Sequence, residues 1–159
     1  MISRPTERDV AAIAALNNMF APEGKTLRRT KQFVEEHLAD YRVIRGEHGR
    51  IVGIVAIDEY SPSLAELVGL AVHPSARGRG YGVALIEEIA DLARRRGFDE
   101  LFATSFSEKI FEACGFKKVT LDHFPEKVLR YTKIDRTEVE MAEKHCFTRV
   151  LREARPAAA

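Results

Sequence analysis

The sequence has few cysteines, no tryptophan and almost no excess of charge. Its two cysteines, Cys114 and Cys146, are far apart and lack the CxxC or Cys/His spacing of a zinc site or a disulfide-rich domain. The formal net charge of +1 provides no general electrostatic field for nucleic acid or an anionic membrane. We therefore expect no metal and no nucleic-acid partner, and we interpret both cysteines as reduced thiols of a cytoplasmic protein.

Long apolar runs are missing as well. No run approaches the ~20 residues that a membrane-spanning helix needs, and charged residues such as Arg4 and Asp9 occupy positions where a signal peptide is apolar. We therefore expect no membrane partner. The remaining composition, 45% hydrophobic and 31% charged, is typical of a globular protein with one core. It predicts one domain over residues 1–151 and a disordered tail over residues 152–159.

The spacing of apolar residues changes along the chain between the period of strands and that of helices. Strands are predicted at 2–4, 41–45, 51–59, 67–72, 101–104, 116–121 and 146–151, and helices from a Thr6–Asp9 cap through Leu16, at 30–40, at 82–96, at 108–114 and within 126–130. The strands at 41–45 and 51–59 should form an antiparallel hairpin, and the unit from 65 to 104 should pair two strands in parallel. The strand at 67–72 is nearly all apolar, which predicts burial on both faces. Together they predict an α/β fold with a mixed sheet of about six to seven strands and about four flanking helices.

Three alternating glycines, Gly78, Gly80 and Gly82, stand between that apolar strand and the helix at 82–96. Glycine lets backbone N–H groups approach a phosphate closely, and the positive end of a helix dipole favours an anion. Arg77 and Arg79 add positive charge. The pattern indicates an anion site, with a flexible turn and two solvated arginines as the alternative.

Two other phosphate-binding loops fit this pattern poorly. A Walker loop ends in Gly-Lys-Ser/Thr, whereas Gly80-Tyr81-Gly82-Val83 has neither the lysine nor the hydroxyl. A dinucleotide-binding unit needs G-x-G-x-x-G near the start of a doubly wound array, whereas this loop has G-x-G-x-G after several strands. A nucleoside triphosphatase is therefore excluded, and a dinucleotide-binding unit is a distant alternative.

The segment Ala65-Glu66-Leu67-Val68-Gly69-Leu70-Ala71-Val72-His73-Pro74, followed by Arg77-x-x-Gly80-x-Gly82, resembles the central motif of GNAT acetyltransferases. Phe111-Glu112-Ala113-Cys114-Gly115-Phe116 is similar to their downstream helix-to-strand motif. This resemblance implies a single GNAT-type domain with acetyl-CoA as co-substrate and no metal. It also implies that the backbone of Leu70, Ala71 and Val72 pairs with the pantetheine arm. The pyrophosphate is then held by the amides of Arg77, Gly78, Arg79, Gly80, Tyr81, Gly82 and Val83, and Phe111 is assigned to the cofactor site.

The resemblance also suggests the catalytic groups. Glu66 matches the position that carries a catalytic glutamate in many family members, so we predict that it is the general base; a solvated glutamate is the alternative. The N–H of Leu70 is the expected oxyanion donor. Phe111 stands where many members have a tyrosine acid, and Ser107 is the candidate substitute, with a plain helix cap as its alternative. Cys114 lacks a histidine or carboxylate nearby in sequence that would activate it as a nucleophile.

Four features resemble the amino-acid acetylating branch typified by N-acetylglutamate synthase: Phe111 itself, Leu27-Arg28-Arg29-Thr30, Tyr41-Arg42-Val43-Ile44 and Phe124-Pro125-Glu126-Lys127. In that branch an arginine like Arg28 contacts the substrate carboxylates, and Lys127 would add a second charge. A solvated basic surface is the alternative. Val68 departs from the branch, because short relatives often carry a basic residue at that position.

The predicted function is therefore acetyl transfer from acetyl-CoA to a small-molecule amine by direct attack in a ternary complex. The α-amine of a free amino acid such as glutamate is the expected acceptor, which would suggest a place in arginine biosynthesis. The alternatives are another small amine, a protein amine, or a non-catalytic module that senses acetyl-CoA. Homodimers are frequent in the resembled family, so a homodimer is the assembly that the resemblance implies.

Overall fold

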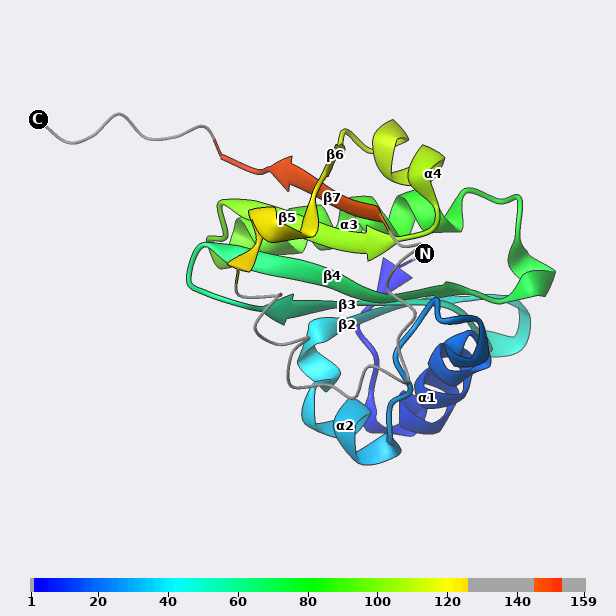
Figure 1. The fold of residues 1–159 in the computed structure, drawn as a ribbon. Helices are drawn as coiled ribbons and strands as arrows, with labels where there is room; N and C mark the ends of the chain where they lie inside the picture. Colours follow the sequence, from blue (N-terminus) through cyan, green and yellow to red (C-terminus); the bar gives the residue numbers. More distant parts are fainter. Residues whose placement is uncertain (1, 126–144, 153–159) are drawn as a thin grey trace, which may run out of the picture.

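A mixed β-sheet with helices on both faces forms the centre of the structure, a computed structural model that describes residues 2–125 and 145–152 (Figure 1). Over those residues the sheet has seven strands in the order β1-β2-β3-β4-β5-β7-β6. The strands are β1 (Ile2–Ser3), β2 (Tyr41–Arg45), β3 (Ile51–Glu59), β4 (Leu64–Val72), β5 (Glu100–Ser105), β6 (Lys117–Val119) and β7 (His145–Val150). The predicted α/β fold is confirmed.

The α-helices of the described ranges are α1 (Val10–Met19), α2 (Lys31–Glu36), α3 (Tyr81–Arg96) and α4 (Glu108–Ala113). The predicted cap before α1 is present, since the Thr6 N–H donates to Asp9 Oδ2 over 2.8 Å. A 3-10 turn, Glu7–Asp9, separates this cap from α1. None of the helices in these ranges combines the length and apolar character that crossing a membrane requires.

The second helix is shorter than predicted. The sequence pattern extended it to residue 40, but α2 ends at Glu36 and a 3-10 turn, Leu38–Asp40, follows. The side chain of His37 accounts for this end, because its Nδ1 lies 2.8 Å from the Phe33 carbonyl oxygen and its ring stacks on the Phe33 ring with the centroids 4.1 Å apart. The prediction of one continuous helix is therefore wrong.

The predicted strand pairings are confirmed. Strands β2 and β3 form the antiparallel hairpin, and β4 pairs with β5 in parallel. The last strand, β7, lies between β5 and β6 and is antiparallel to both, a position that the sequence pattern did not indicate. The strand predicted at 116–121 contains only β6 and is followed by a 3-10 turn, Leu121–His123. The helix predicted within 126–130, and residues 153–159 of the predicted tail, lie outside the described residues.

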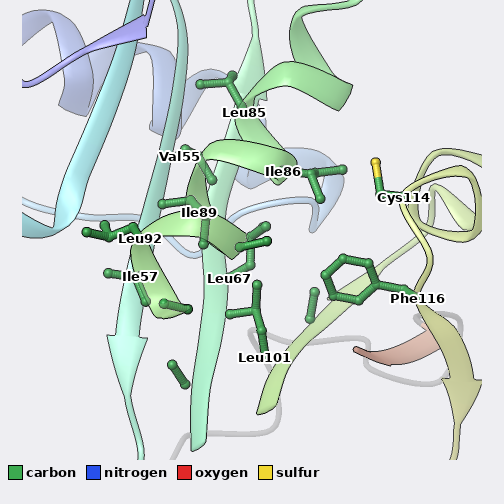
Figure 2. Packing of buried hydrophobic residues seen from close by; sticks show 14 of the residues in the cluster. Val55, Ile57, Leu67, Leu85, Ile86, Ile89, Leu92, Leu101, Cys114 and Phe116 are labelled. Atoms are coloured by element: carbon green, nitrogen blue, oxygen red, sulfur yellow. The ribbon is translucent and has the colours of Figure 1, made fainter. Parts of the chain in front are cut away.

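The core is divided between the two faces of the sheet. Figure 2 shows the larger part, where Ile86 and Ile89 of α3 pack against Val55, Leu67 and Leu101 of the central strands. Helices α1 and α2 cover the opposite face with a second apolar cluster (Figure 1). A third, smaller cluster comprises Leu64, Phe102, Phe124 and Cys146. The middle of β4 therefore packs against apolar side chains on both faces of the sheet.

Candidate active site

One side of β4 is paired along most of its length and the other is not. Strand β3 pairs with β4 from Ala65 to Val72, whereas the parallel pairing with β5 stops at Glu66. From Leu67 to Val72, the side of β4 away from β3 has no ladder partner among residues 2–125 and 145–152; we call this run the β4 edge. Burial on both faces was predicted for this segment, but Val68 is only half-buried, so that prediction is wrong there. An unpaired edge presents backbone donors and acceptors to an extended molecule.

The β4 edge contains a bulge. Ala71 pairs with Ile54 and Val68 with Ala56, so Gly69 and Leu70 together face one residue of β3. Gly69 has a φ of +61°, a left-handed conformation that side chains other than glycine rarely adopt. A bulge interrupts the ladder and redirects the backbone groups next to it. It thus gives a physical reason why the N–H of Leu70 can leave the ladder, although its role as oxyanion donor stays a prediction.

The chain turns sharply after β4. A 3-10 turn, Pro74–Ala76, leads into the glycine turn from Arg77 to Gly80, at which α3 begins. Gly78 and Gly80 both have a φ of +78°, and a Cβ on either would meet no atom within 4 Å. Their backbone conformation therefore requires glycine, whereas packing does not. No side chain caps α3 at Gly80, so the amides of its first turn fit an anion such as a diphosphate.

Gly82 has a different role in the fold. A Cβ at this position would lie 2.6 Å from Cδ1 of Ile110, so glycine lets the start of α3 approach α4 closely. Arg77 and Arg79 are exposed, and neither has an ion-pair partner in the part of the chain that the structure describes. Positively charged guanidinium groups beside the first amides of a helix can bind a diphosphate. The pyrophosphate of CoA is a group of this kind.

Glu66 is a buried carboxylate at the point where β4 and β5 separate. Its residue is 5% exposed, so the alternative of a solvated glutamate does not hold. Its neighbours Ala65 and Leu67 belong to the cluster under α3, and strand alternation therefore directs Glu66 to the opposite face. The hydroxyl of Tyr60 donates to Glu66 Oε2 over 3.1 Å. The assignment of Glu66 as the base stays a prediction.

The residues after β5 lie at the same end of the sheet as the glycine turn, because β4 and β5 are parallel. Ser107 is exposed there, at the N-cap of α4, but its side chain makes no capping hydrogen bond. Its backbone N–H donates to Ser105 Oγ over 2.9 Å. The plain-cap alternative therefore lacks its hydrogen bond, and the role of Ser107 as an acid stays a prediction.

Phe111 and Cys114 are both part of the apolar core. Phe111 is 1% exposed, and its ring centroid lies 5.3 Å from that of Phe116 and 5.4 Å from that of Phe147. Its contact with a cofactor stays a prediction. Burial raises the pKa of the Cys114 thiol, and the negative charge of Glu87 raises it further. A thiol with a raised pKa is a poor nucleophile near neutral pH, which agrees with the absence of an activating partner in sequence.

Arg28 lies on a loop that two asparagines of α1 hold in place. Asn17 Nδ2 donates to the Leu27 carbonyl oxygen over 2.7 Å. Asn18 Nδ2 donates to the Arg29 carbonyl oxygen over 2.8 Å, and its Oδ1 accepts from the Arg29 N–H over 2.8 Å. The exposed Arg28 is thus carried by a backbone fixed on both sides. We call residues 26–29 the acceptor loop.

Asn17 also lies close to β4, since a Cβ on Gly69 would lie 3.4 Å from Asn17 Oδ1. Sequence reasoning missed both asparagines. The available signal was their place near the end of a helix, because asparagine favours helix less than most residues do and binds backbone groups readily. Lys127, the other predicted substrate residue, lies outside the described residues.

No group of three or more His, Cys, Asp or Glu side chains is placed to hold a metal ion within residues 2–125 and 145–152. The residues that the structure brings together are the β4 edge, the glycine turn, Glu66 and, through Asn17, the acceptor loop. The arrangement offers backbone pairing, an anion site and a buried carboxylate along one strand.

The chain is similar in sequence to known proteins. The sequence model of the acetyltransferase (GNAT) family matches residues 11–116. An uncharacterized N-acetyltransferase of Chlorobaculum tepidum is 30% identical over 122 residues, which cover 77% of this chain and 78% of that protein. The amino-acid acetyltransferase of Neisseria meningitidis is 32% identical over 120 residues, covering 74% of this chain but only 27% of that longer protein.

Solved structures agree with the sequence comparison. The N-acetylglutamate synthase of Neisseria gonorrhoeae, complexed with coenzyme A and N-acetyl-glutamate, matches with a TM-score of 0.81 and 27% identity, over 96% of this chain and 35% of that chain. A Mycobacterium tuberculosis protein in complex with CoA shares the fold, with a TM-score of 0.81 and 22% identity over 94% of this chain and 98% of that chain. From the extent of the family match and the shared architecture, the chain belongs to the acetyltransferase (GNAT) family and is an acyltransferase.

Proposed function

We propose that this protein transfers the acetyl group of acetyl-CoA to the α-amine of a free amino acid, such as glutamate, by direct attack in a ternary complex. The observation that carries the proposal is the β4 edge, which begins beside the buried Glu66 and ends at the glycine turn. An extended thioester arm fits along such an edge, with its diphosphate at the turn and its acetyl group toward the carboxylate.

Acetyl-CoA supplies an activated acetyl thioester, and the chain supplies its orientation. The backbone of Leu70, Ala71 and Val72 pairs with the pantetheine arm, while the amides that begin α3, with Arg77 and Arg79, bind the pyrophosphate. The N-acetylglutamate synthase of Neisseria gonorrhoeae, which is complexed with coenzyme A, supports a ligand of this class. Binding the arm to a strand edge fixes the thioester before the amine arrives, which lowers the entropy cost of the reaction.

Glu66 acts on the amine. Its carboxylate accepts a proton from the ammonium group, directly or through a water molecule, and the neutral nitrogen then attacks the thioester carbonyl carbon. The N–H of Leu70 stabilises the oxyanion that forms. When the C–S bond breaks, CoA leaves as a thiolate, which is tolerable because a thiol has a pKa of about 8.5. The nitrogen loses its second proton in this step, and Ser107 or a water molecule relays that proton to sulfur, so that the products are the neutral amide and the thiol.

Three points favour an amino acid as the acceptor. The match to N-acetylglutamate synthase covers nearly the whole chain. Arg28 offers a guanidinium group that can hold a carboxylate through two parallel hydrogen bonds. An α-amine titrates near pH 8 and a lysine side chain near pH 10.4, so deprotonating the lysine costs about 3 kcal/mol more. A single carboxylate base therefore deprotonates an α-amine more readily than a lysine side chain.

A thiol-release assay with acetyl-CoA tests the proposal. The acceptor panel holds L-glutamate, L-glutamine, other amino acids, a polyamine, an aminoglycoside and a lysine peptide. Selective turnover of glutamate or a close relative is the expected result. Turnover of another class would overturn the acceptor assignment, and acetyl-CoA binding without turnover of any acceptor would indicate a sensor.

A further inference from the structure

Within residues 2–125 and 145–152, Tyr60 is the one tyrosine whose hydroxyl hydrogen-bonds to a predicted catalytic side chain, and no motif indicated it. Its hydroxyl donates to Glu66 Oε2 over 3.1 Å. A buried carboxylate is costly unless hydrogen bonds replace its hydration. The phenol of Tyr60 provides one such hydrogen bond.

Tyr60 itself is held by the turn between β3 and β4. Its N–H donates to the Leu64 carbonyl oxygen over 2.9 Å. Its ring lies edge-on to the ring of Phe102, with the centroids 5.1 Å apart and the planes at 81°. The backbone turn and the aromatic contact therefore fix the phenol independently of its bond to Glu66.

We propose that Tyr60 is a positioning residue that holds the Glu66 carboxylate in the orientation needed to accept the proton of the amine. This inference rests on the proposed role of Glu66 as the general base. The hydroxyl restricts the rotation of the glutamate side chain where β4 and β5 separate. A base that is fixed before the substrate binds reaches the reactive geometry without further ordering.

Tyr60→Phe tests the inference, because it removes the hydroxyl and keeps the ring against Phe102. With L-glutamate as acceptor, we expect kcat to fall about tenfold, as for a lost hydrogen bond to a charged group. The KM for acetyl-CoA should stay unchanged, whereas the Tm should fall by a few degrees because the buried carboxylate loses a hydrogen bond. In a Glu66→Gln background, the same change should lower kcat by less than about twofold, because a residue that acts through Glu66 has no effect without it.

Ser61→Ala is the matched control, since it removes a side-chain hydrogen bond of the same turn and leaves the Tyr60 phenol in place. It should lower the Tm without lowering kcat. If Tyr60→Phe keeps the kcat of the parent while Glu66→Gln loses most of it, the inference about Tyr60 is wrong and Glu66 is still supported as the base. Equal losses in both backgrounds, or a loss of kcat shared with Ser61→Ala, overturn it as well. Full turnover of Glu66→Gln removes the proposed base and the inference together.

Discussion

The proposed cofactor side of the site consists mainly of main-chain groups, whereas the proposed acceptor side consists of side chains. The β4 edge and the glycine turn offer backbone groups in one continuous stretch, from Leu67 to Gly80. The acceptor side instead combines Glu66, Tyr60 and the acceptor loop held by α1. A main-chain site needs only a few glycines and an unpaired strand, so it tolerates change in most side chains. The specificity of a site made of side chains can change through a few substitutions, so one fold can accommodate different substrates.

Glu66→Gln gives the largest expected effect and acts on the acceptor side alone. Removal of the general base should lower kcat about 10²–10⁴-fold. The KM for acetyl-CoA should stay unchanged, because the β4 edge and glycine turn remain intact. Steady-state kinetics with both substrates varied will measure this. If Glu66→Gln also lost acetyl-CoA binding, the separation of the two sides would be contradicted, because Glu66 would then belong to the cofactor side.

Arg77→Glu tests the opposite side. Reversal of charge beside the uncapped amides of α3 should raise the KM for acetyl-CoA about tenfold at low ionic strength, with a smaller effect at high salt. The KM for the amino acid should not change. Arg8→Glu, on an exposed turn before α1, is the control for the change in overall charge. An unchanged KM for acetyl-CoA in Arg77→Glu would contradict the placement of the pyrophosphate.

The main-chain features of the molecule could be predicted from the sequence more fully than the side-chain contacts. The glycine turn and the parallel unit of β4 and β5 depend on short, ordered patterns, and the sequence predicted them. The early end of α2 depends on the contact of His37 with Phe33, which no periodicity reveals. The place of β7 between β5 and β6 depends on pairing between distant segments. The hydrogen bonds of Tyr60 and Asn18 reach partners 6 and 11 residues away across a turn and a loop, and no periodic pattern indicates them. The acceptor side was therefore the harder part to predict.

Asn18→Ala should have a moderate effect on the acceptor side. It removes both hydrogen bonds from the side chain to the backbone of Arg29 and so loosens the loop that carries Arg28. We expect the KM for the amino acid to rise about fivefold, consistent with the loss of a neutral hydrogen bond. The KM for acetyl-CoA should be unchanged.

Gln32→Ala is the matched control for Asn18→Ala, because it removes an amide that hydrogen-bonds only on the exposed surface of α2, to Glu36. It should leave both KM values unchanged. A rise in the KM for acetyl-CoA in Asn18→Ala would contradict the separation of the two sides, because it would show that the acceptor loop also supports the cofactor side through Asn17, next to Gly69.

Asp9→Asn should have the smallest effect on catalysis, although it weakens the helix that carries both asparagines. Asp9 accepts two hydrogen bonds from Arg45, 2.6 Å and 2.9 Å long, which join the start of α1 to β2. At pH 7 the free energy of unfolding should fall by about 1–3 kcal/mol, with kcat and both KM values unchanged. Asp91→Asn, which breaks the exposed pair with Arg94, is the control and should cost at most about 0.5 kcal/mol.

The loss in Asp9→Asn should depend on pH in a defined direction. The hydrogen bonds from Arg45 hold the pKa of Asp9 below its ordinary value. Its stabilising effect is therefore complete above the unfolded pKa of about 3.9 and is lost as the pH falls through the lower pKa of the folded state. Urea unfolding of parent and variant should converge in that acidic range. A difference that stays constant down to pH 2 would mean that the protonated Asp9 carboxyl stabilises the start of α1 as well as the carboxylate does, and that its charge contributes nothing to this stability.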